Sequence, residues 1–246
     1  MIIVNSKAGG RGNRLVTIAH AMALAIERND DLLLTAFGRY AADYRCEVSW
    51  DGKVVIRDSM FWDGVRLILA VCRRLGWNGV LHGCVVSDWT FRAPEELSRH
   101  EDVVRKFFTP VHLPLALQRS DGLMLVAVHI RRTDYRDFKK GVYYYDDSVY
   151  ARIMSELVVC MARPIRFVVF SDEQIEERHF ADLECQFMHG GAVEEQWQMG
   201  QCDLIVGPPS TFSAWAGFMG KVPTLLIPNR DYFVRLKDVK YRGLYV

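Results

Sequence analysis

The sequence predicts an α/β fold built on parallel β-sheets. Short apolar runs alternate with helix-length segments along the chain, and glycine-rich or polar turns follow several of these runs. Strands that helices cover on both faces are continuously apolar, and the run at residues 123–129 has this character. Ligands of such sheets bind at the carboxyl ends of the strands. Function is therefore expected in the segments that directly follow strands.

Length, composition and charge narrow the class of protein. The chain has 246 residues, half of them hydrophobic, which is enough for two domains of about 110–140 residues. A stretch with two prolines at 109–118 predicts a division into residues 1–119 and 120–246. The net charge of +1 gives no reason to expect a nucleic-acid or membrane partner. With no apolar run of spanning length and no signal peptide, we expect a cytoplasmic protein.

The apolar periodicity predicts the individual elements. In the N-terminal half we expect strands at 1–5, 32–36, 46–50 and 54–56, the last two as a hairpin, and helices at 14–28, 63–75 and 94–108. In the C-terminal half we expect strands at 123–129, 166–170, 185–188, 204–206 and 224–227, and helices at 148–161, 173–180, 193–201 and 213–219. Three unusual segments then fall at strand ends.

The first of these segments is the turn Gly9-Gly10-Arg11-Gly12-Asn13, with Asn13 as the expected N-cap of the following helix. Glycines let the backbone approach a ligand, and a helix N-terminus favours phosphate. Leu15 stands where the dinucleotide fingerprint has its third glycine, which disfavours a Rossmann dehydrogenase. The same residues also fit an ordinary tight turn before a capped helix.

The second segment, His129-Ile130-Arg131-Arg132-Thr133-Asp134, directly follows a buried strand. Arg131 or Arg132 could clamp a diphosphate through paired, charge-assisted hydrogen bonds. His129 could contact a base or ribose, and Asp134 could hold an arginine or act on the acceptor. The alternative is a surface cluster of ion pairs.

The third segment places Ser210 and Thr211 before a helix, where their hydroxyls could cap it and bind a phosphate oxygen. Asp172 also follows a strand, and its carboxylate could accept hydrogen bonds from guanine or cap a short helix. No set of His, Asp and Glu has metal-ligand spacing, so no metal is expected.

Together the segments resemble the α1,2-fucosyltransferases. The turn resembles their G-G-x-G-N motif, and 129–134 resembles the H-x-R-R-x-D motif that they share with α1,6-fucosyltransferases. The segment Ser210-Thr211-Phe212-Ser213-Ala214-Trp215 is similar to their S-S-F-S-W-W. The resemblance implies a GT-B-type fold, in which two Rossmann-like domains with parallel sheets face a cleft. It implies inverting transfer of fucose from GDP-fucose to a glycan hydroxyl in α1,2 linkage, without a metal or other cofactor.

The resemblance also implies roles for individual residues. Arg131 binds the diphosphate and offsets the charge of the departing GDP. Inversion itself needs a base or an orienting group at the acceptor hydroxyl, and Asp134 and Asp137 are the candidates nearby in the sequence. The rest of the donor site comprises His129 and Asp172 at guanine, Ser210 and Thr211 at phosphate oxygens, Gly12 and Asn13 from the N-terminal acceptor-side domain, and Arg132 and Ser213.

The sequence departs from the family pattern at three places. Arg14 replaces a usual Gln, Ala214 replaces the first Trp of the W-W pair, and residues 135–140 do not match the α1,6 enzymes. The donor side is therefore better defined than the acceptor. A different nucleotide-sugar donor, or a GDP-sugar-binding module without turnover, are the alternatives.

Overall fold

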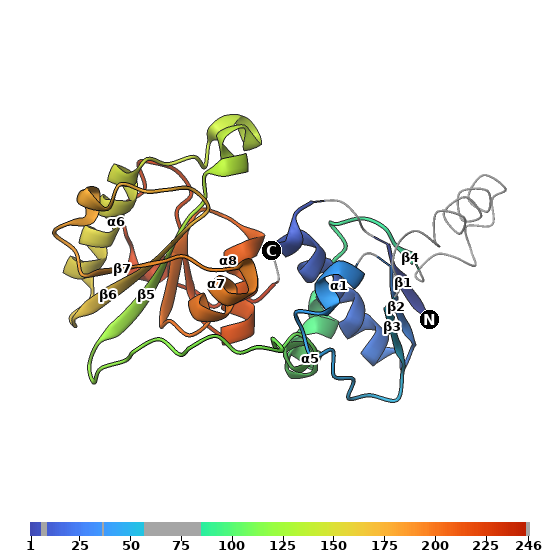
Figure 1. Ribbon diagram of the computed structural model, residues 1–246. Coiled ribbons are helices and arrows are strands. Elements are labelled where there is room, and N and C mark those ends of the chain that lie inside the picture. The colour runs from blue at the N-terminus through green and yellow to red at the C-terminus, as the bar shows by residue number, and fades with distance from the viewer. Residues whose placement is uncertain (6–8, 36, 57–84, 245–246) are drawn as a thin grey trace. The chain divides into compact units, whose positions relative to one another are not determined.

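The computed structural model describes residues 1–5, 9–35, 37–56 and 85–244 (Figure 1). The chain forms two compact units, residues 1–112 (unit 1) and 113–244 (unit 2). The division falls within the proline-containing stretch 109–118, whereas the sequence analysis placed the boundary after residue 119. Among the described residues, no helix combines the length and the apolar character that crossing a bilayer requires.

Unit 1 contains a four-stranded parallel sheet in the order β3-β2-β1-β4. Its strands are β1 (Ile2–Val4), β2 (Leu32–Leu34), β3 (Val54–Ile56) and β4 (Val85–Val86), and its helices are α1 (Arg11–Glu27), α2 (Gly38–Ala41) and α5 (Pro94–Phe107). Helix α1 is almost entirely buried. Its internal His20 is satisfied because Nδ1 accepts a hydrogen bond from the backbone N–H of Ala93, 3.1 Å away.

The predicted hairpin of 46–50 and 54–56 is wrong. β3 pairs in parallel with β2, with Leu32 opposite Val54, and residues 46–50 are not a strand. The backbone N–H groups of Arg45 and Cys46 instead donate to carbonyl groups at the end of α5 and just beyond it. The Asp51-Gly52 turn signal is local, whereas β3 takes its hydrogen-bond partners from β2, which lies about 20 residues earlier in the chain. The helix expected at 63–75 lies outside the described residues.

The first turn of α1 also differs from the prediction. The helix begins at Arg11, so Gly10 occupies the N-cap position and Asn13 lies inside the first turn. Gly9 makes this early start possible, because its φ of +75° belongs to the left-handed region. A Cβ at Gly9 would also lie 2.3 Å from the side-chain nitrogen of Asn13. Arg11 is held by Asp43, at 2.7 Å from its carboxylate.

Unit 2 contains a five-stranded parallel sheet in the order β7-β6-β5-β8-β9. Its strands are β5 (Met124–Ile130), β6 (Ile165–Ser171), β7 (Cys185–Met188), β8 (Leu204–Gly207) and β9 (Thr224–Leu226). Its helices are α6 (Asp147–Cys160), α7 (Ala192–Met199) and α8 (Thr211–Gly220), with 3₁₀ turns η2 (Thr133–Arg136), η3 (Phe138–Gly141), η4 (Glu177–Phe180) and η5 (Leu236–Asp238). The helix expected at 173–180 is thus only the short turn η4.

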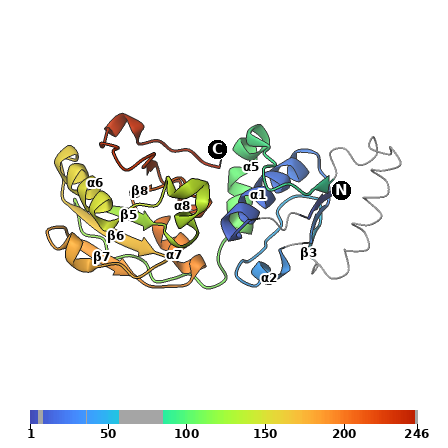
Figure 2. The same cartoon turned by 90° about the horizontal axis from the view of Figure 1, so that it is seen from above.

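Helices cover both faces of this sheet, and Figure 2 shows α6 and α7 on opposite sides of it. Even-numbered residues of β5 pack with α6 in one core cluster. Leu125 and Ala127 belong to the other cluster, with Met199 of α7 and Ala216 of α8. Side chains alternate along a strand, so His129 belongs to the α7–α8 side. Strands covered on both faces are apolar throughout, which is why these strands could be predicted.

Candidate active site

The strand order of unit 2 brings the predicted segments together. β5 lies between β6 and β8, and the chain builds the sheet outward from β5 first on one side and then on the other. The edge formed by the carboxyl ends of β5 and β8 is therefore a topological switch point, the place where open α/β sheets bind ligands. Arg131 follows β5, Asp172 follows the adjacent β6, and Ser210 follows β8.

The guanidinium of Arg131 is held at this edge by two carboxylates. Its Nη2 lies 2.7 Å from Asp134 Oδ1, and its Nη1 lies 2.8 Å from Asp172 Oδ2. The ring of Tyr135 lies below it, with 5.9 Å from the guanidinium carbon to the ring centroid. The side chain remains 28% exposed. Arg131 is thus a positioned cation that an anionic ligand can reach.

Asp172 organises the start of the β5–α6 loop (residues 131–146). Its Oδ1 accepts a hydrogen bond from the backbone N–H of Arg132 at 2.8 Å, and its Oδ2 accepts one from the Thr133 hydroxyl at 2.6 Å. With the Arg131 ion pair, one carboxylate fixes three consecutive residues. Asp172 therefore ties the loop after β5 to the end of β6.

Arg132 points into the interior of unit 2. Its guanidinium forms an ion pair with Asp147 at the start of α6, and its Nε donates to the backbone carbonyl of Tyr145 at 3.3 Å. The second oxygen of Asp147 accepts from the backbone N–H of Glu176 at 3.4 Å and lies 3.2 Å from His179 Nδ1. The sequence analysis missed Asp147, because an acidic residue in a first helical turn is typical of any helix.

His129 is buried at the end of β5, with 3% of its surface exposed. Its ring lies 5.2 Å from that of Phe212 in α8, and Nδ1 has no hydrogen-bond partner among the described residues. Burial, and secondarily the Arg131 cation, lowers the pKa of His129 to about 4. The imidazole is therefore neutral at physiological pH. Gly207 of β8 permits this packing, since a Cβ there would lie 2.7 Å from the His129 carbonyl oxygen.

Helix α8 begins at the same edge. The Ser210 hydroxyl caps it by accepting a hydrogen bond from the Phe212 N–H at 3.2 Å, as predicted for a capping residue. Ser213 is buried and donates to the Ser210 carbonyl at 3.2 Å, and Thr211 is partly exposed in the first turn. Tyr135 joins the two segments, because its hydroxyl donates to the Pro209 carbonyl.

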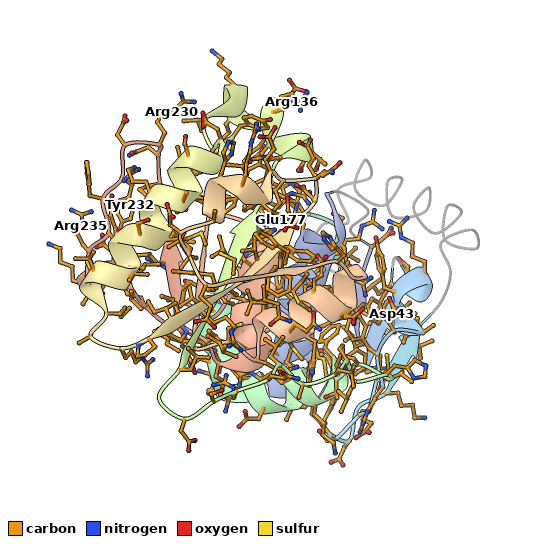
Figure 3. The ribbon with its side chains drawn as sticks, turned by 60° about the vertical axis from the view of Figure 1, so that its left-hand side comes forward. Asp43, Arg136, Glu177, Arg230, Tyr232 and Arg235 are labelled. Atoms are coloured by element: carbon orange, nitrogen blue, oxygen red, sulfur yellow. The ribbon has the colours of Figure 1, made fainter. Side chains whose placement is uncertain are left out.

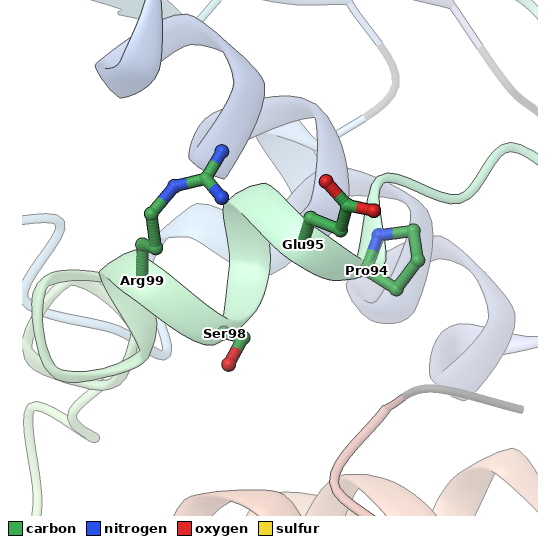
Figure 4. A pocket seen from close by; sticks show the side chains of 4 residues that line it. All are labelled: Pro94, Glu95, Ser98 and Arg99. Atoms are coloured by element: carbon green, nitrogen blue, oxygen red, sulfur yellow. The ribbon is translucent and has the colours of Figure 1, made fainter.

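The structure therefore brings seven predicted site residues to one edge of unit 2: His129, Arg131, Asp134, Asp172, Ser210, Thr211 and Ser213. The eighth, Arg132, follows the same strand, but its guanidinium points into the interior towards Asp147. Gly12 and Asn13 lie in the first turn of α1 in unit 1. Within the described residues, no group of His, Cys, Asp and Glu is arranged to hold a metal ion. A shallow pocket on α5, of about 450 Å³, is lined by Pro94, Glu95, Ser98 and Arg99 (Figure 4) and involves none of the predicted residues.

Comparison with known proteins supports this picture at two levels. No protein-family model matches the chain. In sequence it is 25% identical to an α-1,2-colitosyltransferase from Escherichia coli, over 89% of this chain and 87% of that enzyme.

In structure the chain is similar to the fucosyltransferase NodZ from Bradyrhizobium, with a TM-score of 0.61 at 14% identity over 95% of this chain and 97% of NodZ. It is also similar to FUT1 of Arabidopsis thaliana in complex with GDP, with a TM-score of 0.60 at 12% identity over 97% of this chain and 73% of FUT1.

These likenesses confirm the predicted α/β fold of the GT-B type, with a parallel sheet in each of two units. The similarity in sequence to a glycosyltransferase extends along most of the chain, and the described architecture is the one on which such enzymes are built. The sequence match is thus to an enzyme of the class that the motifs predicted.

Proposed function

We propose that the protein is an inverting, metal-independent transferase that moves a deoxysugar, fucose or colitose, from its GDP-linked donor to a glycan hydroxyl, forming an α1,2 linkage. The observation that carries this proposal is the position of Arg131. It is a partly exposed guanidinium, held by two carboxylates at the switch point of unit 2, beside the N-terminus of α8.

The electrostatics of this edge suit the departure of a nucleoside diphosphate. Breaking the bond between sugar and phosphate builds negative charge on the diphosphate, and positioned donors aimed at that charge stabilise the transition state. Arg131 supplies a bidentate cation, and the free N–H groups and positive dipole end of α8 lie at the next strand end. These groups would supply the charge that a divalent metal supplies in other transferases.

His129 and Asp172 would face the guanine base. A neutral His129 with an unpaired Nδ1 can accept or donate a single hydrogen bond to the base without placing a charge beside it. Asp172 already binds Arg131, Arg132 and Thr133, so its principal contribution would be to hold the loop. One remaining lone pair of its carboxylate would accept a hydrogen bond from the base. Ser210 and Thr211 would approach the phosphate oxygens at the start of α8.

Two acidic residues are candidates for activating the acceptor hydroxyl. Asp134 is paired with Arg131 at 2.7 Å, which supports a role in holding that arginine. Asp137 is exposed on the same loop. We expect Asp134→Asn to lower donor affinity together with turnover, and Asp137→Asn to lower turnover alone if it is the base.

We infer the donor sugar from what the similar proteins use. An α-1,2-colitosyltransferase matches the chain by sequence, and NodZ has been studied as an α-1,6-fucosyltransferase soaked with GDP-fucose. The sequence similarity favours the α1,2 linkage, and it makes colitose a specific second candidate for the sugar.

Calorimetry with GDP, GDP-fucose, GDP-mannose and UDP tests the donor class. We expect binding of GDP and its deoxysugar conjugate, and weak or no binding of UDP. Product analysis with GDP-fucose and GDP-colitose then decides between the two sugars and determines the linkage. A preference for UDP would refute the proposed donor. Binding of GDP with neither sugar transfer nor slow hydrolysis of the donor would favour a binding module.

A further inference from the structure

The β5–α6 loop carries a cluster of aromatic rings immediately beyond Arg131. The ring centroids of Tyr135 and Phe138 are 5.3 Å apart, and Tyr143 lies 6.4 Å from each of them. The rings of Phe138 and Tyr143 are stacked, with an interplanar angle of 29°. We call Tyr135, Phe138 and Tyr143 the aromatic strip.

The strip reaches from the site outward to solvent. Its inner end, Tyr135, is buried and lies under the Arg131 guanidinium. The Tyr135 hydroxyl donates a hydrogen bond to the Pro209 carbonyl. Its outer end, Phe138, is 44% exposed, and the neighbouring Val142 is also exposed. In Figure 1 the turns η2 and η3, which carry Tyr135 and Phe138, project beyond the end of β5. An exposed apolar patch continuous with an active site is typical of a ligand-binding surface.

The backbone of η3 is held in an unusual conformation. Lys139, Lys140 and Gly141 are three consecutive residues in the left-handed region, with φ of 50°, 63° and 73°. For each of the two lysines this conformation costs about 1–2 kcal/mol, and such strain concentrates at ligand sites. The turn brings the Lys139 ammonium to 5.5 Å from the Phe138 ring centroid and 5.6 Å from that of Tyr143.

We propose that the aromatic strip and Lys139 bind a neutral pyranose ring of the acceptor glycan. This inference rests on the proposed transferase function. The C–H face of a pyranose carries slight positive charge, which suits the negative face of an aromatic ring. The Lys139 ammonium, which lies over the rings of Phe138 and Tyr143, can donate hydrogen bonds to the sugar hydroxyls.

The position of the aromatic strip indicates that it binds the acceptor rather than the donor. The donor groups Arg131, His129 and Ser210 lie at the strand ends, whereas Phe138 lies further along the loop, towards solvent. The attacking hydroxyl must come to about 3–3.5 Å from the sugar carbon that the diphosphate leaves. A surface that holds the acceptor must therefore adjoin Arg131, as the strip does through Tyr135.

Charge identifies the sugar as neutral. The loop carries five basic side chains and three acidic ones, namely Arg131, Arg132, Arg136, Lys139, Lys140, Asp134, Asp137 and Asp146. Its three arginines are paired with carboxylates outside the loop, Arg131 with Asp172, Arg132 with Asp147, and Arg136 with Glu173 at 3.5 Å. Figure 3 shows Arg136 at the outer edge of the unit. With these partners counted, the loop has no positive excess of charge that would select an anionic sugar.

The test is to replace Phe138 with Ala and, as a conservative variant, with Tyr. Phe233→Ala is the matched control, because Phe233 is an exposed phenylalanine of unit 2 outside the loop. Saturation-transfer NMR of the full chain with lactose, N-acetyllactosamine and chitobiose, without donor, measures saccharide binding directly. Calorimetry with GDP measures the donor site in the same variants.

We expect Phe138→Ala to lose the saccharide signal and to raise the acceptor KM about tenfold or more, with the Kd for GDP unchanged. Phe138→Tyr and Phe233→Ala should behave as the wild type does. The inference is overturned if the wild type binds none of the three saccharides, if Phe138→Ala binds them normally, or if that variant loses GDP affinity equally. Saccharide binding that depends on Phe138 in a protein that does not bind GDP would refute the proposed donor instead.

Discussion

Arg132 and Asp147 form an ion pair in the interior of unit 2, with side-chain exposures of only 10% and 7%. Arg132 belongs to the loop after β5, and Asp147 belongs to the first turn of α6. Through its second oxygen Asp147 also contacts His179, after β6. The pair thus joins three segments of unit 2 next to Arg131, whose guanidinium is partly exposed.

Asp147→Asn should destabilise the protein by about 3–5 kcal/mol, because it leaves the buried Arg132 cation without a counter-charge. Urea unfolding measures this directly. Asp146→Asn is the matched control, since Asp146 is the exposed neighbour at the N-cap and Asn caps helices equally well. An Asp147→Asn protein as stable as the control would show that the ion pair does not hold the loop.

Arg131→Ala should lower kcat about 10²–10³-fold, because the variant lacks the donor aimed at the developing diphosphate charge. The fold should be retained, since the side chain lies at the surface edge of the sheet. Arg131→Lys should recover only part of the rate, because an ammonium lacks the planar fork of a guanidinium. Arg178→Ala, at an exposed arginine of η4, is the control. Unchanged turnover in Arg131→Ala would remove this residue from the mechanism.

His129 should make the stability of the protein depend on pH. Burial lowers its pKa from 6.5 to about 4, so between these values the unfolded chain binds more protons than the folded one. This contribution is fully present above pH 6.5 and is lost as the pH falls towards 4. From pH 7.5 to pH 5 the loss amounts to about 2 kcal/mol.

Urea unfolding at these two pH values, in wild type and in His129→Gln, isolates the effect of the histidine. The variant should lose about 2 kcal/mol less than the wild type on acidification. His189→Gln should behave as the wild type, because His189 is exposed. The same pH dependence in His129→Gln and wild type would mean that another group is responsible.

Gly9→Ala should destabilise unit 1 by about 1–2 kcal/mol, because an L side chain is unfavourable in the left-handed region. Its Cβ would in addition press on Asn13. Gly10→Ala is the control, since φ at Gly10 is −73° and a Cβ there meets nothing within 4 Å. Because Gly10 is the N-cap, where Ala is less favourable than Gly, we expect Gly10→Ala to cost less than Gly9→Ala but not to be neutral. We expect urea denaturation followed by circular dichroism to separate the two variants. Equal stability would mean that the turn relaxes without the glycine.

The strands and helices of unit 2 could be predicted because the apolar pattern that specifies each of them lies within the element itself. β7 was predicted with its observed bounds, and the other strands of the sheet to within one residue at each end. For the central strands the reason is burial on both faces, which requires apolar side chains throughout, whereas β7 is a partly exposed edge strand. The hairpin at 46–56 and the N-cap at Asn13 were wrong, because a distant strand in the first case and a left-handed Gly9 in the second decided the outcome.

The amino-acid sequence alone specifies the alternation of strands and helices and the polar segments at strand ends, because both follow from the period and burial of nearby side chains. Only the tertiary structure decides that β5 lies between β6 and β8, so that Arg131, Asp172 and Ser210 share one edge. It likewise decides the partner of Arg132 and the neutral state of His129. Those properties depend on contacts between residues far apart in the chain, and the pattern of neighbouring residues does not determine such contacts.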